Sequence, residues 1–357
     1  MNKSTTVLDF EKDSLGNSPV IPRIYSFDTL KVLAIIGVIV FHVYPFAGIN
    51  AEFYRLYRTL WGFSVPVFFI VSGYLLAMKI GNGDNVSWRF KKNLKRLFFL
   101  LIAWSSVYLT IPIGWIHQRR LGAFLAGWQA AYAEMIHRPA LILGQGVEAH
   151  LWFIIALITA LFIAYPFVKY KKIKMLLVLA SGFYRVSLLT GAYAWSPLGF
   201  SIGFDTRNGP FIATLFVTIG VILAESKYRP SVTTASFIFA SGLAIQMIEA
   251  ALIFHYIPRQ RILDEYYIGT IPYALGLVML ALNLPDLGKK IRIQRIGPYV
   301  LGIYMIQFIV IKYLLKINYG MHNVLWQLFY TPIVLLLSLL IAICMAKIPY
   351  VKKLVKT

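Results

Sequence analysis

Long apolar runs constrain this chain more than any other feature of its sequence. Runs of about 18 to 25 apolar residues are long enough to cross a hydrocarbon core of about 30 Å as helices. We therefore expect an all-α, polytopic integral membrane protein with about ten transmembrane helices. The expected spans are residues 32–49, 60–78, 97–116, 151–168, 175–194, 209–224, 232–256, 267–284, 298–315 and 325–346.

The placement of the charged residues predicts how the helices are oriented. The net charge is +21, yet 24 of the 35 Lys and Arg lie before the first span, in the even-numbered gaps and after the last span. Because basic loops stay on the cytoplasmic side, both termini are expected in the cytoplasm. The excess of basic residues needs no nucleic-acid partner and fits a multi-pass protein of the bacterial cytoplasmic membrane, with the lipid bilayer as its solvent.

The sequence shows no appended soluble domain. We expect a cytoplasmic N-terminal segment over residues 1–31, one transmembrane domain over residues 32–346 and a basic cytoplasmic tail over residues 347–357. An apolar stretch at residues 121–133 is too short to span and is expected to lie at the interface or to cover an external cavity. The one cysteine, Cys344, allows no intrachain disulfide.

Four ionisable residues fall inside the expected spans, where such groups are costly and often functional. They are His42, Arg185, Glu249 and Lys312. Lys312 lies near the end of its span and is expected to extend to the interface without a further role. Arg185 and Glu249 could form a buried ion pair or contribute to substrate binding.

His42 has the most suggestive neighbours in the sequence. Lys31 lies 11 residues earlier, close to three helical turns, so the two side chains share one face about 16 Å apart. Asp28 lies about 40° from that face. Pro45 is expected to kink the helix beside the imidazole and so to favour a cavity. A histidine bonded to a neighbouring helix for structural reasons is the alternative.

The segment from Arg23 to Lys31 and the helix that continues to His42 resemble the opening of the membrane acyltransferase 3 family. The mark of that family is Arg or Lys, then ten residues, then His. Lys31 and His42 match this spacing.

Further segments resemble the same family in the same order along the chain. They are residues 68–76 with the pair Ser72-Gly73, the basic run 89–96, and His150-Leu151-Trp152-Phe153. The family places two arginines three residues apart in the basic run. This chain has lysines, Lys92 and Lys95, at that spacing, and Asn93 with Arg96.

The resemblance implies an enzyme that transfers an acyl group, usually acetyl, from cytoplasmic acyl coenzyme A to a hydroxyl. The acceptor would be a cell-envelope polysaccharide or its lipid-linked precursor, and no metal is expected. Acyl-CoA, as acetyl-CoA, would be the co-substrate. The residues that would take part are His42, Lys31 and Asp28 in catalysis, Lys92, Lys95, Arg96 and Ser72 in donor binding, and Glu148, His150 and Trp152 in acceptor binding.

Two roles are open for His42, and one other class of protein competes with the enzyme. A neutral imidazole could act as general base on the acceptor hydroxyl, or it could carry the acyl group as a transient acyl-imidazole. A transporter or flippase for a glycan or a lipid-linked sugar, with His42 as a proton relay, is the alternative function.

Overall fold

The computed structural model describes residues 23–44, 50–110, 144–226, 230–256, 266–315 and 323–356, with residues 129, 132–133 and 136–137 in addition. Regular structure in these residues is helical and includes no strand. The longer helices are α1 (Tyr25–Val43), α3 (Ser64–Gly81), α4 (Val86–Thr110), α8 (Trp152–Lys169), α9 (Ile173–Thr190), α10 (Pro210–Glu225), α11 (Val232–Tyr256), α12 (Thr270–Asn283), α13 (Val300–Leu315) and α14 (Val324–Ala346).

The all-helical fold class predicted from the sequence is confirmed. Within the described residues, seven helical segments are long and apolar enough to cross a membrane, and α10 and α12 are shorter apolar helices. Each expected span overlaps one of the ten helices named above, but α4 carries five basic residues in its first half and stands apart from the seven. The number of about ten crossings and the side on which the termini lie therefore stay predictions.

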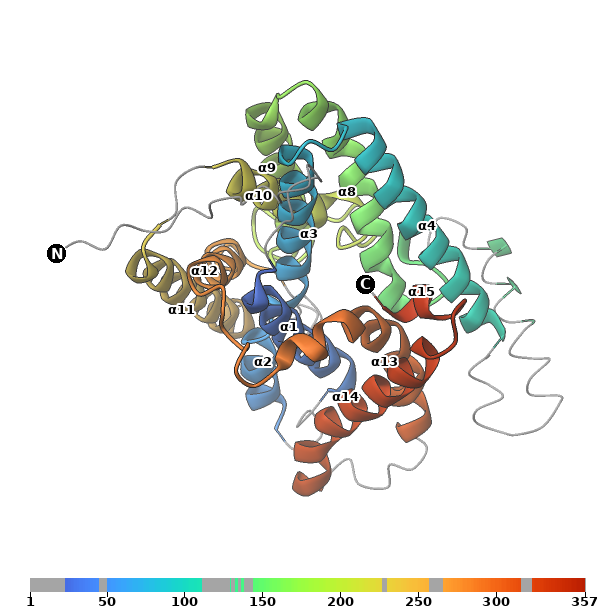
Figure 1. Cartoon of the computed structure of the whole chain (residues 1–357). Helices are drawn as coiled ribbons and strands as arrows, with labels where there is room; N and C mark the ends of the chain where they lie inside the picture. The colour runs from blue at the N-terminus through green and yellow to red at the C-terminus, as the bar shows by residue number, and fades with distance from the viewer. Residues whose placement is uncertain are drawn as a thin grey trace.

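Helix α1 occupies the middle of the molecule (Figure 1). It packs against α3, α12, α13 and α14, and most of its side chains are buried. An apolar sequence accounts for this position, because a helix that is hydrophobic on all sides is buried in protein or faces lipid. The position also places Lys31 and His42 among other helices rather than against lipid.

Helices α3 and α10 pack closely because glycines face backbone across their interface. A Cβ atom at Gly73 of α3 would collide with the carbonyl oxygen of Val217, and one at Gly220 of α10 would collide with that of Ile70. Small residues at such positions let helices approach within a membrane, where packing rather than the hydrophobic effect holds them together. The pair forms a firm support for the face of α3 that carries Ser72.

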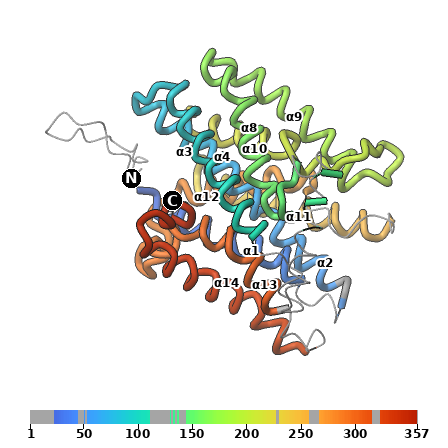
Figure 2. Tube along the Cα trace, turned by 90° about the vertical axis from the view of Figure 1, so that its right-hand side faces the viewer, coloured from blue at the N-terminus to red at the C-terminus, as the bar shows by residue number. Residues whose placement is uncertain are grey.

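Two peripheral helices have the character of lipid-facing elements. Helices α11 and α14 lie on the outside of the bundle, each mainly against one partner helix (Figures 1 and 2). Large apolar side chains stay exposed on both, including Phe237 and Ile248 on α11 and Phe329 and Leu336 on α14. These surfaces suit the hydrocarbon of a bilayer and would be costly in water.

The C-terminal residues form a docked segment rather than a free tail. The short helix α15 (Lys352–Val355) packs against α13, α14 and α4. Trp104 of α4 donates its indole N–H to the carbonyl of Leu354 at 3.2 Å, and Val355 is fully buried. The residues predicted to be a basic tail therefore complete one end of the bundle.

Arg185 and Glu249 do not form the buried ion pair that was one of the two roles considered for them. Arg185 is exposed on α9, whereas the Glu249 carboxylate accepts hydrogen bonds from the backbone N–H groups of Ile268 at 3.0 Å and Gly269 at 2.6 Å, and from the Tyr193 hydroxyl. The first N–H groups of a helix lack partners within it and attract a carboxylate. Glu249 thus caps the start of α12. The apolar stretch expected at residues 121–133 lies almost entirely outside the described residues.

Candidate functional site

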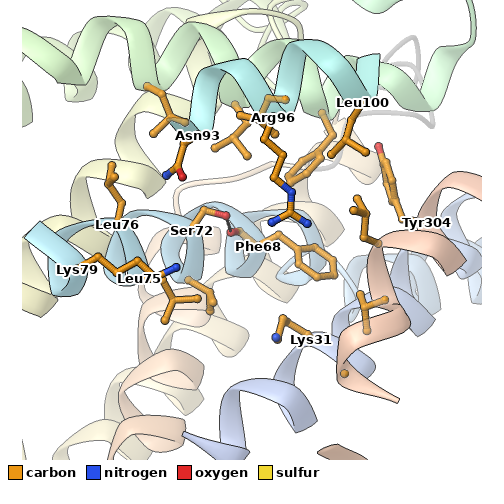
Figure 3. A pocket seen from close by; sticks show the side chains of 18 residues that line it. Lys31, Phe68, Ser72, Leu75, Leu76, Lys79, Asn93, Arg96, Leu100 and Tyr304 are labelled. Atoms are coloured by element: carbon orange, nitrogen blue, oxygen red, sulfur yellow. Dashed lines mark hydrogen bonds between the residues drawn. The ribbon is translucent and has the colours of Figure 1, made fainter. Parts of the chain in front are cut away.

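A cavity of about 400 Å³ lies between α1, α3, α4, α8 and α13, beside the 3₁₀ turn at Gly297 (Figure 3). Polar side chains gather at one end of it and apolar side chains line the rest. The lining residues are Lys31, Phe68, Val71, Ser72, Leu75, Leu76, Lys79, Asn93, Arg96, Leu97, Leu100, Phe153, Leu157, Leu161, Gly297, Val300, Leu301 and Tyr304.

Three cations from three helices line one end of the cavity, called the basic end below. They are Lys31 of α1, Lys79 of α3 and Arg96 of α4. Figure 3 shows the Arg96 guanidinium directed across the cavity from α4 toward the side on which Lys31 lies. Lys79 and Arg96 are exposed, so this end is open to solvent and able to bind an anion.

Lys31 is held in place by an acid on its own helix. Its Nζ lies 2.8 Å from Oδ1 of Asp28, and Asp28 also pairs with Arg23, whose guanidinium nitrogen lies 2.8 Å from Oδ2. The Asp28 side chain is buried, and the Gly297 backbone approaches it so closely that a Cβ there would collide with its carboxylate. Asp28 thus anchors the Lys31 side chain, and its part in catalysis stays a prediction.

The basic run of α4 contributes fewer of its cations to the cavity than expected. Arg96 and Asn93 line it, whereas Lys92 and Lys95 are exposed and do not. The Nζ of Lys92 instead lies 4.5 Å from the ring centroid of Trp88. One face of a helix is shared by residues three or four apart, so Lys92 and Arg96 could have faced the same way. Of the residues of α4, only Asn93, Arg96, Leu97 and Leu100 line the cavity.

Ser72 lines the cavity about two helical turns from Lys79. Its hydroxyl donates to the Phe68 carbonyl at 2.7 Å, as serines in membrane helices commonly do. Its oxygen can still accept a hydrogen bond within the cavity. The donor-binding role expected of Ser72 stays a prediction.

Aromatic side chains from three helices also line the cavity. They are Phe68 of α3, Phe153 of α8 and Tyr304 of α13. The Phe153 ring centroid lies 6.1 Å from that of Phe68 and 5.5 Å from that of Tyr304. These three residues are called the aromatic barrier below.

His42 lies just beyond the aromatic barrier. Its ring centroid is 5.0 Å from that of Phe308 in an edge-to-face arrangement, and Phe308 follows Tyr304 by one turn on the same face of α13. The Arg58 guanidinium carbon lies 5.0 Å from the ring centroid of Phe41, the residue before His42. Lys31 and His42 therefore mark the two ends of one path along α1, as their spacing predicted.

The local helix geometry around His42 differs from the prediction. His42 was expected about halfway along a helix kinked by Pro45, but α1 ends at Val43 and Tyr44 adopts a left-handed conformation with φ of 53°. Proline disfavours the helical conformation of the residue before it, which accounts for the end of the helix. His42 thus lies in the last turn of α1, and Pro45 lies outside the described residues.

His150 is buried rather than presented at an outer face. It has no exposed surface, and neither ring nitrogen has a hydrogen-bond partner among the described residues. Its ring stacks on Phe308 with centroids 4.8 Å apart, and its backbone carbonyl accepts a hydrogen bond from the Tyr304 hydroxyl. The two histidines predicted at separate sites therefore contact the same phenylalanine ring.

The other two residues predicted to bind the acceptor lie near this pair. Glu148 accepts a hydrogen bond from the Lys312 Nζ at 2.6 Å, and this Nζ also lies 4.7 Å from the Phe308 ring centroid. Lys312, expected to extend freely to the interface, is thus an ion-pair partner because Glu148 comes within its reach. Trp152 is buried and lies under the Arg207 guanidinium, 5.2 Å from ring centroid to carbon.

The structure adds residues to which the sequence assigned no role in the site. Lys79 joins the basic end, and α13 lines the path with Tyr304, Phe308 and Lys312. These three are spaced at four-residue intervals, which places them on one helical face. That spacing is visible in the sequence, but nothing in it shows that α13 packs against α1.

Comparisons with known proteins show the family of the chain. The family model described as an acyltransferase domain, of acyltransferase family 3, matches residues 24–343. The chain is also similar to a serine/alanine racemase from Enterococcus gallinarum, with 24% identity over 237 residues. This similarity covers 63% of the present chain and 32% of the racemase, so the chain spans about a third of that relative's length.

No solved structure matches the chain. The family match extends from the turn before Asp28 to the last described turns of α14 and so includes both ends of the cavity and His42. It supports acyltransferase activity for a multi-pass membrane protein. The chain belongs to acyltransferase family 3.

Proposed function

We propose that this protein is an integral membrane O-acyltransferase that moves an acetyl group from acyl coenzyme A to a hydroxyl of a cell-envelope polysaccharide or of its lipid-linked precursor. One observation carries the proposal. A single cavity begins at three cations from three helices and ends, past an apolar lining, at the aromatic barrier beside His42.

The basic end suits the nucleotide part of the donor. Coenzyme A carries several phosphate charges, and Lys31, Lys79 and Arg96 present ammonium and guanidinium groups from different directions. A guanidinium can bind phosphate through two parallel hydrogen bonds, whereas an ammonium acts as a point charge. Asn93 and Ser72 add uncharged polar groups farther along the lining. Lys92 and Lys95 lie on the solvent side of α4 and would act on the donor through long-range attraction.

The apolar part of the cavity suits the pantetheine arm and the acyl group. Leu75, Leu157 and Val300 line it from three helices. A long, thin ligand in this part of the cavity would be removed from contact with water. Lys31 and His42 are 11 residues apart on α1, about 16 Å along the helix. An extended arm covers that length, so the thioester can reach the barrier while the phosphates stay at the cations.

His42 is the group proposed to act on the acceptor. As general base, its imidazole takes the proton of the acceptor hydroxyl while the hydroxyl oxygen attacks the thioester carbonyl. The carbon–sulfur bond breaks, and coenzyme A leaves as the thiol after taking up a proton. In the competing path the imidazole nitrogen attacks first, and the acyl-imidazole then transfers its acyl group to the hydroxyl.

The acceptor is proposed to approach from the Glu148 side. Glu148 is partly exposed, whereas Trp152 and His150 are buried. A carboxylate can accept hydrogen bonds from sugar hydroxyls, and aromatic rings suit the apolar faces of sugars. Under this proposal, the acceptor contacts Glu148 first, and the buried side chains of His150 and Trp152 lie beneath it.

Turnover by the purified protein tests the proposal. The protein in detergent is incubated with acetyl-CoA and envelope glycan from cells that lack it, and both free thiol and the mass of the glycan are followed. We expect thiol release that depends on the glycan, and a gain of one acetyl group per modified sugar. A protein that moves the glycan or its lipid-linked form across vesicles without releasing thiol would contradict the proposal and favour a flippase.

A further inference from the structure

The aromatic barrier separates the donor cavity from the catalytic histidine proposed above. Three of the helices that line the cavity contribute one residue each to this barrier, Phe68, Phe153 and Tyr304. Neither His42 nor Phe308 lines the cavity. A thioester that fills the cavity therefore stops about one helical turn short of the imidazole.

Of the three barrier residues, Tyr304 has contacts both on the cavity side and on the His42 side. Its side chain is 7% exposed, its ring contacts Phe153, and its hydroxyl donates to the backbone carbonyl of His150. That hydrogen bond joins α13 to the 3₁₀ turn before α8. Its loss would leave the carbonyl without this donor, which costs free energy in an apolar surrounding.

The layer beyond Tyr304 consists of the residues around His42. Phe308 lies one turn farther along α13, with the His150 ring stacked on it and the His42 ring against it. The His150 and Tyr304 ring centroids are 5.6 Å apart. Tyr304 is thus the residue of the barrier that touches both the cavity and this second layer.

We propose that Tyr304 gates the passage between the donor cavity and His42 and thereby restricts transfer to short acyl groups. The proposal rests on the proposed function for the identity of the ligand, but the barrier itself is a property of the fold. With the ring in place, the thioester is kept from His42 and from water on the far side. Displacement of the ring opens a passage whose width is set by the side chain at this position.

The gate has a chemical consequence as well as a steric one. If the passage stays open, water that enters from the far side attacks the thioester carbonyl, the carbon–sulfur bond breaks, and the products are the free acid and coenzyme A thiol. A smaller side chain at position 304 should therefore raise acyl-CoA hydrolysis in the absence of acceptor. It should also admit acyl groups longer than acetyl.

The first experiment measures passage without relying on catalysis. The one native cysteine is removed by Cys344→Ser, and His42→Cys introduces a thiol at the far side of the barrier. The protein is reconstituted in sealed vesicles, and a charged, membrane-impermeant thiol reagent is added on the side at which Lys91 and Lys95 face solvent. The labelling rate of the new cysteine is then compared between variants at position 304.

Tyr304→Ala should raise this labelling rate about tenfold or more, and Tyr304→Phe about two- to threefold, because the second keeps the ring and loses only the hydrogen bond. Phe153→Leu opens the barrier from α8 and should also raise the rate, which keeps the test decisive if Tyr304→Ala folds poorly. Tyr313→Ala is the matched control, because Tyr313 lies on the same helix and is exposed. Equal rates in all these proteins would overturn the gate.

The second experiment uses His42-containing protein and a series of acyl-CoA donors. Tyr304→Ala should shift the ratio of hexanoyl to acetyl turnover upward by about tenfold and raise hydrolysis without acceptor, whereas Tyr313→Ala should change neither. Unchanged chain-length preference in a folded Tyr304→Ala protein would overturn the restriction to short acyl groups. If the wild-type protein turned over no acyl-CoA at all, the proposed function would fail, while the labelling rates would still decide whether the barrier is a gate.

Discussion

The two ends of the path along α1 are built in opposite ways. The basic end is an open cavity whose cations come from three helices, and Lys79 and Arg96 there are exposed. At the other end the His42 side chain is partly exposed. His150 there has no exposed surface, and the His42 and His150 rings lie against Phe308.

This difference indicates how the two substrates would bind. A charged, solvated end can bind a polyanion with little rearrangement, because its side chains already face the cavity. At the His42 end, aromatic side chains lie between the cavity and the imidazole, so they must move before a thioester in the cavity can reach it. We therefore expect donor binding to depend on charge and to be fast, and transfer to depend on movement of side chains at the His42 end.

The largest effect is expected at His42. His42→Gln and His42→Ala should lower turnover by about a hundredfold or more, because a general base contributes about 10² to 10⁴ in rate. The affinity for acetyl-CoA should change little, since His42 does not line the cavity. Turnover is measured by thiol release and donor affinity by titration calorimetry. Normal acylation of the glycan by folded His42→Ala protein would exclude the catalytic assignment.

The basic end should show the reverse pattern. Arg96→Gln and Lys79→Gln should each weaken acetyl-CoA binding by about tenfold, because a hydrogen bond between charged groups is worth about 1.5–3 kcal/mol and part of it is replaced by water. Lys91→Gln removes the same charge from an exposed position of α4 and is the matched control. The loss of acetyl-CoA affinity in Lys92→Gln and in Lys95→Gln should be smaller than in Arg96→Gln and larger than in Lys91→Gln. Equal losses for Arg96→Gln and Lys91→Gln would show that the cavity is not the donor site.

The sequence predicted the helices well because each apolar run is long and uninterrupted. Three residues that the family resemblance singled out, Lys31, Ser72 and Arg96, line one cavity, but their roles in donor binding and catalysis stay predictions. The sequence could not place Lys79 or Tyr304, because their roles depend on which helices pack together. The burial of His150 and the pairing of Lys312 with Glu148 also depend on which helices pack together, so the sequence could not predict them.

The third prediction concerns stability at the His42 end. The Glu148 and Lys312 side chains are each 15% exposed and pair at 2.6 Å, so Glu148→Gln leaves a mostly buried ammonium without its carboxylate. We expect a loss of about 1–3 kcal/mol in stability. The Tm in detergent reports it. Adding Lys312→Met to Glu148→Gln should recover part of the loss, and a double variant less stable than the single one would contradict the pairing. Donor affinity should not change.

The smallest effect is expected at Asp28, which belongs to the basic end but does not line the cavity. Asp28→Asn removes the carboxylate that pairs with both Lys31 and Arg23. Both cations are partly exposed and can be hydrated, so the loss should be about 1 kcal/mol, equivalent to an increase of about fivefold in the KM for acetyl-CoA. The value of kcat should change less, because Asp28 acts through the position of Lys31.

Asp286→Asn is the control for Asp28→Asn, since Asp286 also pairs with a lysine three residues away but is exposed. If Asp28 positions the cations of the basic end before the donor binds, Asp28→Asn should raise the KM for acetyl-CoA more than Asp286→Asn does. If instead Asp28→Asn lowered kcat and left the KM unchanged, Asp28 would act on the chemistry at His42. The contrast between a donor end governed by charge and a His42 end governed by movement would then have to be abandoned, because one residue of the basic end would control the far end.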